Sequence, residues 1–170
     1  MSSAGGDGGV SLAVFKAAMA HLAGGVVIVT TADPAGARHG MTATAVCSVS
    51  LEPPLVMACM SRDAATHRAV SVSGAFALNL LSDEAESLAR RFASSRLDKF
   101  EGLATTPAAS GAPLLDGALA HCDCTVEQTV TAGDHTIFIG RVSAADVSAI
   151  EDATPLLYYR GDYRTVAEPA

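Results

Sequence analysis

Residues 119–147 read LAHCDCTVEQTVTAGDHTIFIGRVSAADV, two long apolar-rich runs separated by a short turn sequence. The runs are Leu119–Val130 and Thr136–Val147, and Ala132-Gly133-Asp134 lies between them. A glycine followed by an aspartate favours a tight turn, so this stretch predicts a long β-hairpin. His135 then begins the second strand, which puts a titratable ring at the open end of a β-structure, where a ligand can reach it.

The rest of the chain adds further strands. They are expected at Val26–Thr31, Met41–Leu51, Leu55–Met60, Ala75–Leu81 and Pro155–Tyr159. About seven strands, with helices inserted only between the early ones, predict a mainly β protein: a closed or nearly closed β-barrel with peripheral helices. Strands and helices do not alternate regularly, and no G-x-G-x-x-G follows a strand, so a doubly wound dinucleotide-binding sheet is disfavoured.

Three peripheral helices are expected. Ser11 can cap the first, which Gly24-Gly25 ends. Its apolar residues recur at helical spacing: Leu12, Phe15, Met19 and Leu22. Asp63 can cap a second helix that runs to about Val72, and Asp83 with Glu86 resembles a capping box for a third. Between the elements, Glu52-Pro53-Pro54 interrupts strand pairing, and Ser94–Pro113 is expected to be rich in loops.

The composition indicates one globular domain over residues 11–166, after a flexible tail over residues 1–10. The 170 residues are 49 % hydrophobic and 17 % charged, and their formal net charge is −7. An acidic chain without a basic block is a poor nucleic-acid binder. No apolar run approaches the roughly 20 residues that span a bilayer, and the first residues do not resemble a signal peptide. We therefore expect a cytoplasmic protein that binds neither nucleic acid nor membrane.

All four cysteines lie in strand-like stretches. Cys47, Cys59, Cys122 and Cys124 are therefore expected to be free, buried thiols rather than a disulfide framework. The spacing of Cys122 and Cys124 puts both on one strand face, but no second Cys pair or His cluster completes a four-ligand site. No metal site is expected. Serine-hydrolase and phosphate-loop motifs are also missing.

Two stretches carry polar groups that have both a structural and a functional interpretation. The strand Met41–Leu51 is expected to present Thr42, Thr44, Ser48 and Ser50 on one face, toward either solvent or a polar ligand, and spacing alone favours solvent. Ser61–Thr66 lies between a strand and a helix. Its hydroxyls, Arg62 and the free helix N–H groups can hold a phosphate, or they simply form a capped surface helix.

The histidine and the tyrosines also have both a structural and a functional interpretation. His135 is an ordinary satisfied histidine, a donor to a ligand amide or phosphate, or a group that carries a proton near neutral pH. The chain has three tyrosines, Tyr158, Tyr159 and Tyr163, all near its end. They either close the core or supply stacking surface and hydroxyls at a site.

Taken in order, the motifs resemble the short-chain flavin reductase family, the reductase components of two-component flavin monooxygenases. The resemblance runs from Leu12 to Arg164. It is carried by Gly40-Met41-Thr42-Ala43-Thr44-Ala45, Ser48-Val49-Ser50-Leu51-Glu52-Pro53-Pro54-Leu55, Phe76-Ala77-Leu78-Asn79-Leu80-Leu81, Asp98-Lys99-Phe100-Glu101-Gly102, Gly133-Asp134-His135-Thr136-Ile137 and Pro155-Leu156-Leu157-Tyr158-Tyr159-Arg160-Gly161.

The resemblance implies an FMN-binding split β-barrel of Greek-key type, in a homodimer with the flavin near the subunit interface. It implies hydride transfer from NADH or NADPH to FMN or FAD, after which the reduced flavin diffuses to a flavin-dependent monooxygenase. In such a protein the cofactor carries the redox chemistry, and the chain supplies binding and orientation.

The resemblance also assigns site residues. It implies that His135 lies beside the nicotinamide, and that Thr42, Ala43, Thr44 and Ser48 approach the isoalloxazine edge. The ribityl phosphate is matched to Cys59, Ser61, Arg62 and Thr66. Phe92 and the loop from Arg96 to Phe100 are expected to flank the flavin or its adenylate end, and Tyr158 or Tyr163 to help form the nicotinamide pocket.

Two rival functions use the same barrel. One is a flavin-binding module for storage or sensing, without reductase turnover. The other is an oxidase of pyridoxine-phosphate type that acts on a small substrate. The match at Gly133–Ile137 favours the reductase over both.

Overall fold

The hairpin predicted around Gly133 is confirmed and forms the longest element of the fold. In the computed structural model, which describes residues 9–96, 98–149 and 153–167, strands β9 (Ala120–Ala132) and β10 (His135–Val147) pair antiparallel along their whole length. Gly133 adopts a positive φ of 61° in the turn, a conformation that costs glycine little. The predicted tail at residues 1–10 falls mostly on residues 1–8, which lie outside the described part of the chain.

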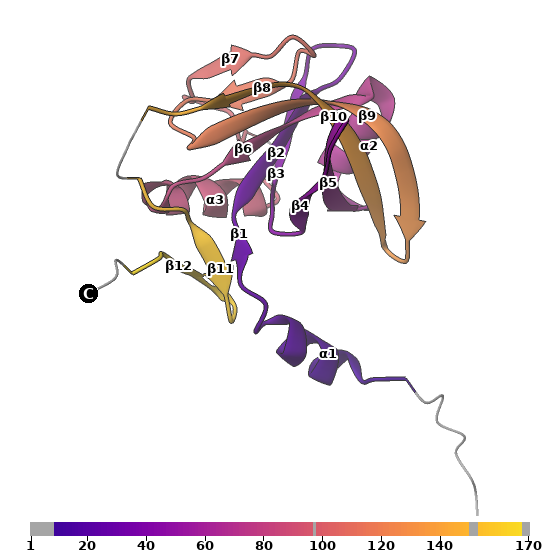
Figure 1. Ribbon diagram of the computed structural model, residues 1–170, viewed down its shortest axis with the longest axis vertical. Helices are drawn as coiled ribbons and strands as arrows, with labels where there is room; N and C mark the ends of the chain where they lie inside the picture. Colours follow the sequence, from indigo (N-terminus) through magenta and orange to yellow (C-terminus); the bar gives the residue numbers. More distant parts are fainter. Residues whose placement is uncertain (1–8, 97, 150–152, 168–170) are drawn as a thin grey trace, which may run out of the picture.

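This hairpin is part of a seven-stranded antiparallel sheet (Figure 1). The other strands are β2 (Val27–Ala32), β3 (Arg38–Ala43), β4 (Val46–Leu51), β5 (Pro54–Ser61) and β6 (Ala75–Leu80). The strand order is β3-β2-β6-β9-β10-β5-β4. The two edge strands, β3 and β4, follow each other in the chain with only Thr44 and Ala45 between them. The sheet therefore curls toward closure, as a split barrel does.

Two apolar clusters hold the barrel and its outer helices together. One contains Val29, Met60, Phe76 and Phe138 and fills the inside of the curled sheet. The other contains Ile28, Phe92, Phe100 and Leu115 and packs α3 (Glu86–Ala93) onto the outside of β2. Strand β2 is buried on both faces, which explains why its sequence is a continuous β-branched run rather than an alternation.

The single strand predicted over Met41–Leu51 is wrong. The chain breaks at Thr44-Ala45 and leaves β3 and β4 at opposite edges of the sheet. The break changes the alternation, so that Met41 and Val46 both pack against the inner cluster while Cys47 is exposed. A register shift between Ser48 and Ser50 then leaves Val49 without a partner in the register with β5, as in a β-bulge.

The first helix, α1 (Leu12–Met19), is capped by Ser11 as predicted, but it ends before Leu22. Gly24-Gly25 does not stop this helix; it forms β1, which pairs with β11 (Leu157–Tyr159). None of the residues of α1 is buried. Figure 1 shows the helix projecting away from the barrel.

Two predicted helix caps are wrong. Helix α2 (Ala65–Ser73) begins after Ala64 and has no side-chain cap, so Asp63 does not serve as one. At the next helix, Asp83 starts a 3₁₀ turn, η1 (Asp83–Ala85), and α3 follows it. The Asp83 carboxylate instead accepts hydrogen bonds from the hydroxyls of Thr154 at 2.6 Å and Thr165 at 3.1 Å, which attaches the C-terminal segment to the barrel.

Short strands complete the fold. The predicted last strand is found as β11, and β12 (Asp162–Arg164) pairs with it. The expected loop at Ser94–Pro113 contains β7 (Thr105–Pro107), which pairs with β8 (Pro113–Leu115). Within the described residues, no helix is long and apolar enough to cross a membrane.

The cysteines are free, as predicted, but they are not all buried. Cys47 is exposed, whereas Cys124 lies in the inner cluster, where burial raises its pKa to about 12. Cys122 packs against the same cluster, which confirms the core interpretation of the Cys122–Cys124 pair.

Candidate functional site

Three segments that are far apart in the sequence meet where the β9–β10 hairpin joins β5. Ser61 pairs with His135, and the Arg62 N–H donates to the Asp134 carbonyl at 3.0 Å. The Cys59 N–H donates to the Ala45 carbonyl at 2.9 Å, which brings in the junction between β3 and β4. The end of β5, the start of β10 and the start of β4 therefore form one connected region.

Alternation along β5 and β10 divides their side chains between the core and the outside of the barrel. Ala58, Met60, Thr136 and Phe138 are buried inside, so Cys59, Ser61, His135 and Ile137 face outward. Cys59 lies opposite Ile137 in the register. We call the half-exposed outward row Met57, Cys59, Ile137 and Ile139 the outer strip. It is an apolar surface that ends at the polar pair Ser61 and His135.

His135 lies at the polar end of the outer strip. Its side chain is 46 % exposed, and its Nδ1 lies 2.8 Å from Oδ1 of Asp134. The interaction with His135 lowers the pKa of the Asp134 carboxyl, so this group is a carboxylate that accepts a hydrogen bond from Nδ1–H. In the neutral ring, Nε2 then carries the lone pair and is the atom left for a ligand.

The segment after β5 leads into the first turn of α2. Ser61 is half-buried and Arg62 is exposed, so both are accessible beside His135. Thr66 is 3 % exposed and faces the core, so its hydroxyl does not reach the surface. The first-turn N–H groups of a helix lack partners within the helix and favour an anion. Of the predicted phosphate group, Ser61, Arg62 and Cys59 are brought together at the surface, and Thr66 is not.

The residues predicted to approach the isoalloxazine edge also differ in whether their side chains are accessible. Thr44 is exposed at the junction between the edge strands, and Ser48 is exposed within β4, where it pairs with Val56. The Thr42 hydroxyl donates to the Ala89 carbonyl at 2.7 Å and so attaches β3 to α3, while Ala43 is buried in the inner cluster. Only the main chain of these two residues is available to a ligand.

Phe92 and Phe100 lie in the outer apolar cluster. Their rings meet edge to face, with centroids 5.0 Å apart. A Cβ placed on Gly40 would approach the Phe92 ring to 2.5 Å, so the glycine makes room for this ring. Both rings are buried, which assigns them to packing rather than to ligand contact. Arg96 is exposed and paired with Asp98 at 2.8 Å.

The tyrosines lie on the small sheet formed by β1, β11 and β12. Tyr158 pairs with Tyr163 across two strands, with ring centroids 5.3 Å apart, and the Arg90 guanidinium covers the Tyr163 ring at 4.7 Å. Figure 1 shows this sheet and the tip of the β9–β10 hairpin as separate projections below the barrel. Within one chain, the tyrosine pair belongs to a different surface from His135.

His67 is a residue of this region that sequence reasoning missed. Its Nε2 lies 2.8 Å from Oγ1 of Thr136, the inward neighbour of His135. Burial, together with the nearby charges of Arg62 and Arg68, lowers the pKa of His67, so the ring is neutral at pH 7. No motif in the sequence marks this histidine, because only strand register brings Thr136 to it.

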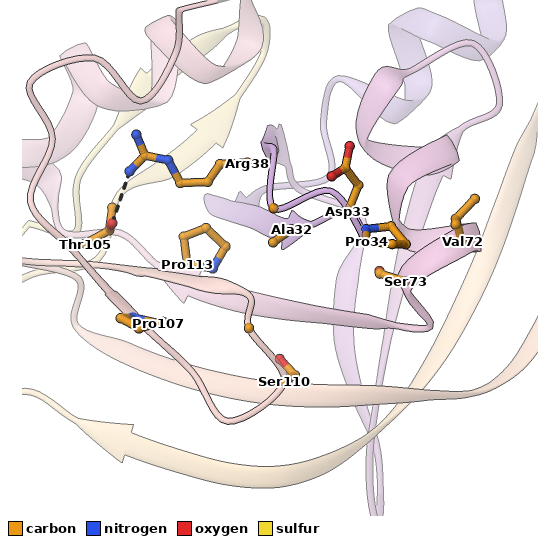
Figure 2. Close-up of a pocket in the computed structure, with 12 residues that line it drawn as sticks. Ala32, Asp33, Pro34, Arg38, Val72, Ser73, Thr105, Pro107, Ser110 and Pro113 are labelled. Atoms are coloured by element: carbon orange, nitrogen blue, oxygen red, sulfur yellow. Dashed lines mark hydrogen bonds between the residues drawn. The ribbon is translucent and has the colours of Figure 1, made fainter.

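A cavity of about 550 Å³ opens beside the β2–β3 turn, and none of the predicted site residues lines it. Figure 2 shows Arg38 hydrogen-bonded to Thr105 across its wall, at 3.3 Å. The Asp33 carboxylate accepts from the N–H groups of Ala35 and Ala37 and contacts His39. These polar groups stabilise the turn and the β7 segment, so the cavity is a weaker candidate than the region around His135.

Comparison with known proteins places this chain in a family. Residues 19–167 match the flavin reductase like domain. The reductase subunit HsaB of a flavin-dependent monooxygenase from Rhodococcus jostii is 39 % identical over 174 residues, covering 99 % of this chain and 87 % of that protein. A flavin reductase (NADH) from Kitasatospora aureofaciens is 40 % identical over 151 residues, covering 88 % of this chain and 78 % of that protein.

A solved structure extends the comparison to the fold. The NADH:FAD oxidoreductase of Streptomyces globisporus C-1027, in complex with NAD and FAD fragments, superimposes with a TM-score of 0.85 at 34 % identity. The match covers 92 % of this chain and 93 % of that one. By its sequence and its split barrel, this chain belongs to the flavin reductase-like family.

Proposed function

We propose that this protein is an NAD(P)H:flavin oxidoreductase that reduces FMN or FAD and supplies the reduced flavin to a flavin-dependent monooxygenase. The observation that carries the proposal is the meeting of the β3–β4 junction, the end of β5 and His135 at one surface, in a chain that belongs to the flavin reductase-like family. The reductase names of its relatives from Rhodococcus and Kitasatospora support it.

The residues at this surface suit a flavin. The outer strip offers an apolar surface for an aromatic ring system, and the hydroxyl of Ser61 lies at its polar end. Arg62 and the first turn of α2 provide the positive field that a phosphate requires, in a chain whose net charge is otherwise −7. A flavin bound there would supply the redox chemistry, because it accepts a hydride from the nicotinamide.

The task of the protein is then to hold two rings in contact, which is a proximity effect and needs no nucleophile. His135 borders the outer strip, and Asp134 keeps its Nδ1 protonated. Its Nε2 is therefore an acceptor suited to the amide N–H of a nicotinamide. We assign His135 to orienting the nicotinamide, not to moving a proton.

We propose further that residues 11–166 form one domain and that the protein is a homodimer with the flavin site near the subunit interface. Two apolar surfaces support the dimer. The outer strip is only half-covered, and α1 exposes half or more of Leu12, Val14 and Phe15. Exposed apolar surfaces of this kind mark sites of association.

Steady-state oxidation of NADH and NADPH, each with FMN and with FAD, tests the assignment of His135. His135→Ala should raise the KM for the preferred nucleotide about tenfold, because one hydrogen bond of about 1.4 kcal/mol is lost. The Kd for flavin, measured by fluorescence, should stay unchanged because His135 is assigned to the nicotinamide.

His39→Ala is the matched control, because His39 also pairs with an aspartate, Asp33 at 3.2 Å, but near the β2–β3 turn. It should leave both constants unchanged. A loss of flavin binding in His135→Ala with unchanged nicotinamide kinetics would show that the role given to His135 is wrong. Flavin binding by the wild-type protein without oxidation of either nucleotide would favour a storage or sensing module instead.

A further inference from the structure

Thr136 and His135 are consecutive residues on opposite faces of β10. His135 points outward, whereas Thr136 is 8 % exposed and points into the barrel. Residues 127–135, which form the outer end of the hairpin, are all exposed. The end of the hairpin therefore receives little support from packing, and its position depends on the contacts at residues 134–136.

Three contacts join this strand end to the segment over residues 61–67. Two of them are main-chain contacts: the pairing of Ser61 with His135 and the 3.0 Å bond from the Arg62 N–H to the Asp134 carbonyl. The third is the 2.8 Å contact between His67 Nε2 and Thr136 Oγ1, which uses side chains alone. It connects the first turn of α2 to the residue behind His135.

The surroundings of His67 leave its ring one defined hydrogen bond. The ring meets Phe138 edge to face, with centroids 5.2 Å apart, which fixes its plane. Its Nδ1 is buried and has no hydrogen-bond partner within the described part of the chain. The contact with Thr136 is thus the polar interaction that orients the imidazole, and it also fixes the rotamer of the threonine.

We infer that His67 is a positioning residue, which holds Thr136 from inside the barrel and thereby fixes His135 against the outer strip. The inference rests on the proposed role of His135 and deepens it. The inference joins two parts of the site into one connected unit. One is the segment over residues 61–66, which is proposed to bind phosphate, and the other is His135, which is proposed to face the nicotinamide. A shift of the threonine is passed directly to His135, the preceding residue of the strand, where a displacement of the order of 1 Å is enough to impair ring alignment.

The test uses two single variants and their combination. Thr136→Val removes the hydroxyl at nearly constant shape, and His67→Phe removes both ring nitrogens while keeping an aromatic ring beside Phe138. Thr131→Val is the matched control, because Thr131 lies directly opposite Thr136 in the hairpin but is exposed. Each protein is assayed for the KM of NADH, kcat, the Kd for flavin and the thermal midpoint Tm.

Each single variant should raise the KM for NADH about three- to tenfold, with a smaller change in the Kd for flavin. The double variant should be no worse than either single variant, because both remove the same link. The ring ¹⁵N signals of His135, assigned by their loss in His135→Ala, should shift in both variants and not in Thr131→Val. A lower Tm with unchanged KM and unchanged His135 signals would overturn the inference and leave His67 as a packing residue.

The ring signals separate this inference from the proposed function. If the wild-type protein oxidises no nucleotide with either flavin, the function is wrong. The response of the His135 signals to Thr136→Val and His67→Phe then still decides whether His67 positions His135.

Discussion

At the scale of single residues, the candidate site depends on two histidines at the start of β10. His135 points outward from the strand, and His67 of α2 contacts its inward face through Thr136. His135 follows a glycine turn and begins an apolar strand, so its place at an open end of the sheet could be predicted from the sequence. His67 could not be predicted, because its partner Thr136 is 69 residues away and only the register of β5 and β10 brings them together. Local patterns locate residues along an element and carry no information about such distant contacts.

Two buried phenylalanines are among the assignments that the structure moved away from the site. Phe92 and Phe100 follow motifs that resemble the family, yet both pack in the outer apolar cluster. The space for Phe92 comes from Gly40, and inside the barrel Gly140 makes the same kind of room for Phe76. The motif predicted where these residues lie in the fold, whereas burial determines what they can touch.

A substitution at Gly140 tests how tightly the inner cluster is packed. A Cβ there would lie 2.6 Å from the Phe76 ring and 3.0 Å from Cβ of Cys124. Gly140→Ala should therefore lower the free energy of unfolding by about 1–3 kcal/mol through overpacking, measured by urea denaturation. Gly25→Ala, whose Cβ meets nothing within 4 Å, should change it by less than about 0.5 kcal/mol. Equal values for the two variants would contradict this account of the core.

At the scale of elements, the strands were predicted better than the ends of helices. Runs such as β2 and β6 are buried along nearly their whole length, so composition alone identifies them. The break at Thr44-Ala45 was not predicted: Val46 interrupts the polar face of the alternation directly after it, but one apolar residue does not show that the chain crosses from one sheet edge to the other. That break matters for the site, since it brings the Ala45 carbonyl to β5, where it accepts a hydrogen bond from the Cys59 N–H.

Helix α1 has no buried residue within the part of the chain that the structure describes. The exposed fractions of Phe15 and Met19 are 50 % and 48 %. If α1 is part of the proposed dimer interface, changing Phe15 and Met19 together to Ser should raise the dimer dissociation constant about tenfold or more, measured by sedimentation velocity. The free energy of unfolding of the monomer should change by less than about 0.5 kcal/mol.

Val72→Ser provides the control for this experiment. Val72 is 69 % exposed on α2, so its substitution removes apolar surface elsewhere. It should leave the dissociation constant unchanged. A dimer that is equally strong in all three proteins would exclude α1 from the interface, and a monomeric wild-type protein would contradict the proposed assembly.

At the scale of the whole molecule, the split barrel and the family could be predicted because many weak motifs occur in the expected order along nearly the whole chain. The arrangement of the site could not, because it depends on the curl of one sheet that brings its edge strands β3 and β4 together. The barrel places an apolar strip and an exposed histidine on one outer surface, next to the segment that leads into α2. The proposed alignment of a flavin with a nicotinamide rests on these features.

Anaerobic rapid mixing tests the central claim most directly. The protein, mixed with FMN or FAD and one equivalent of NADH or NADPH, should bleach the visible absorption of the flavin far faster than the same mixture without protein. Admission of oxygen should restore that absorption. Bleaching no faster than in buffer, for all four pairs of flavin and nucleotide, would contradict the assignment of this protein as a flavin reductase.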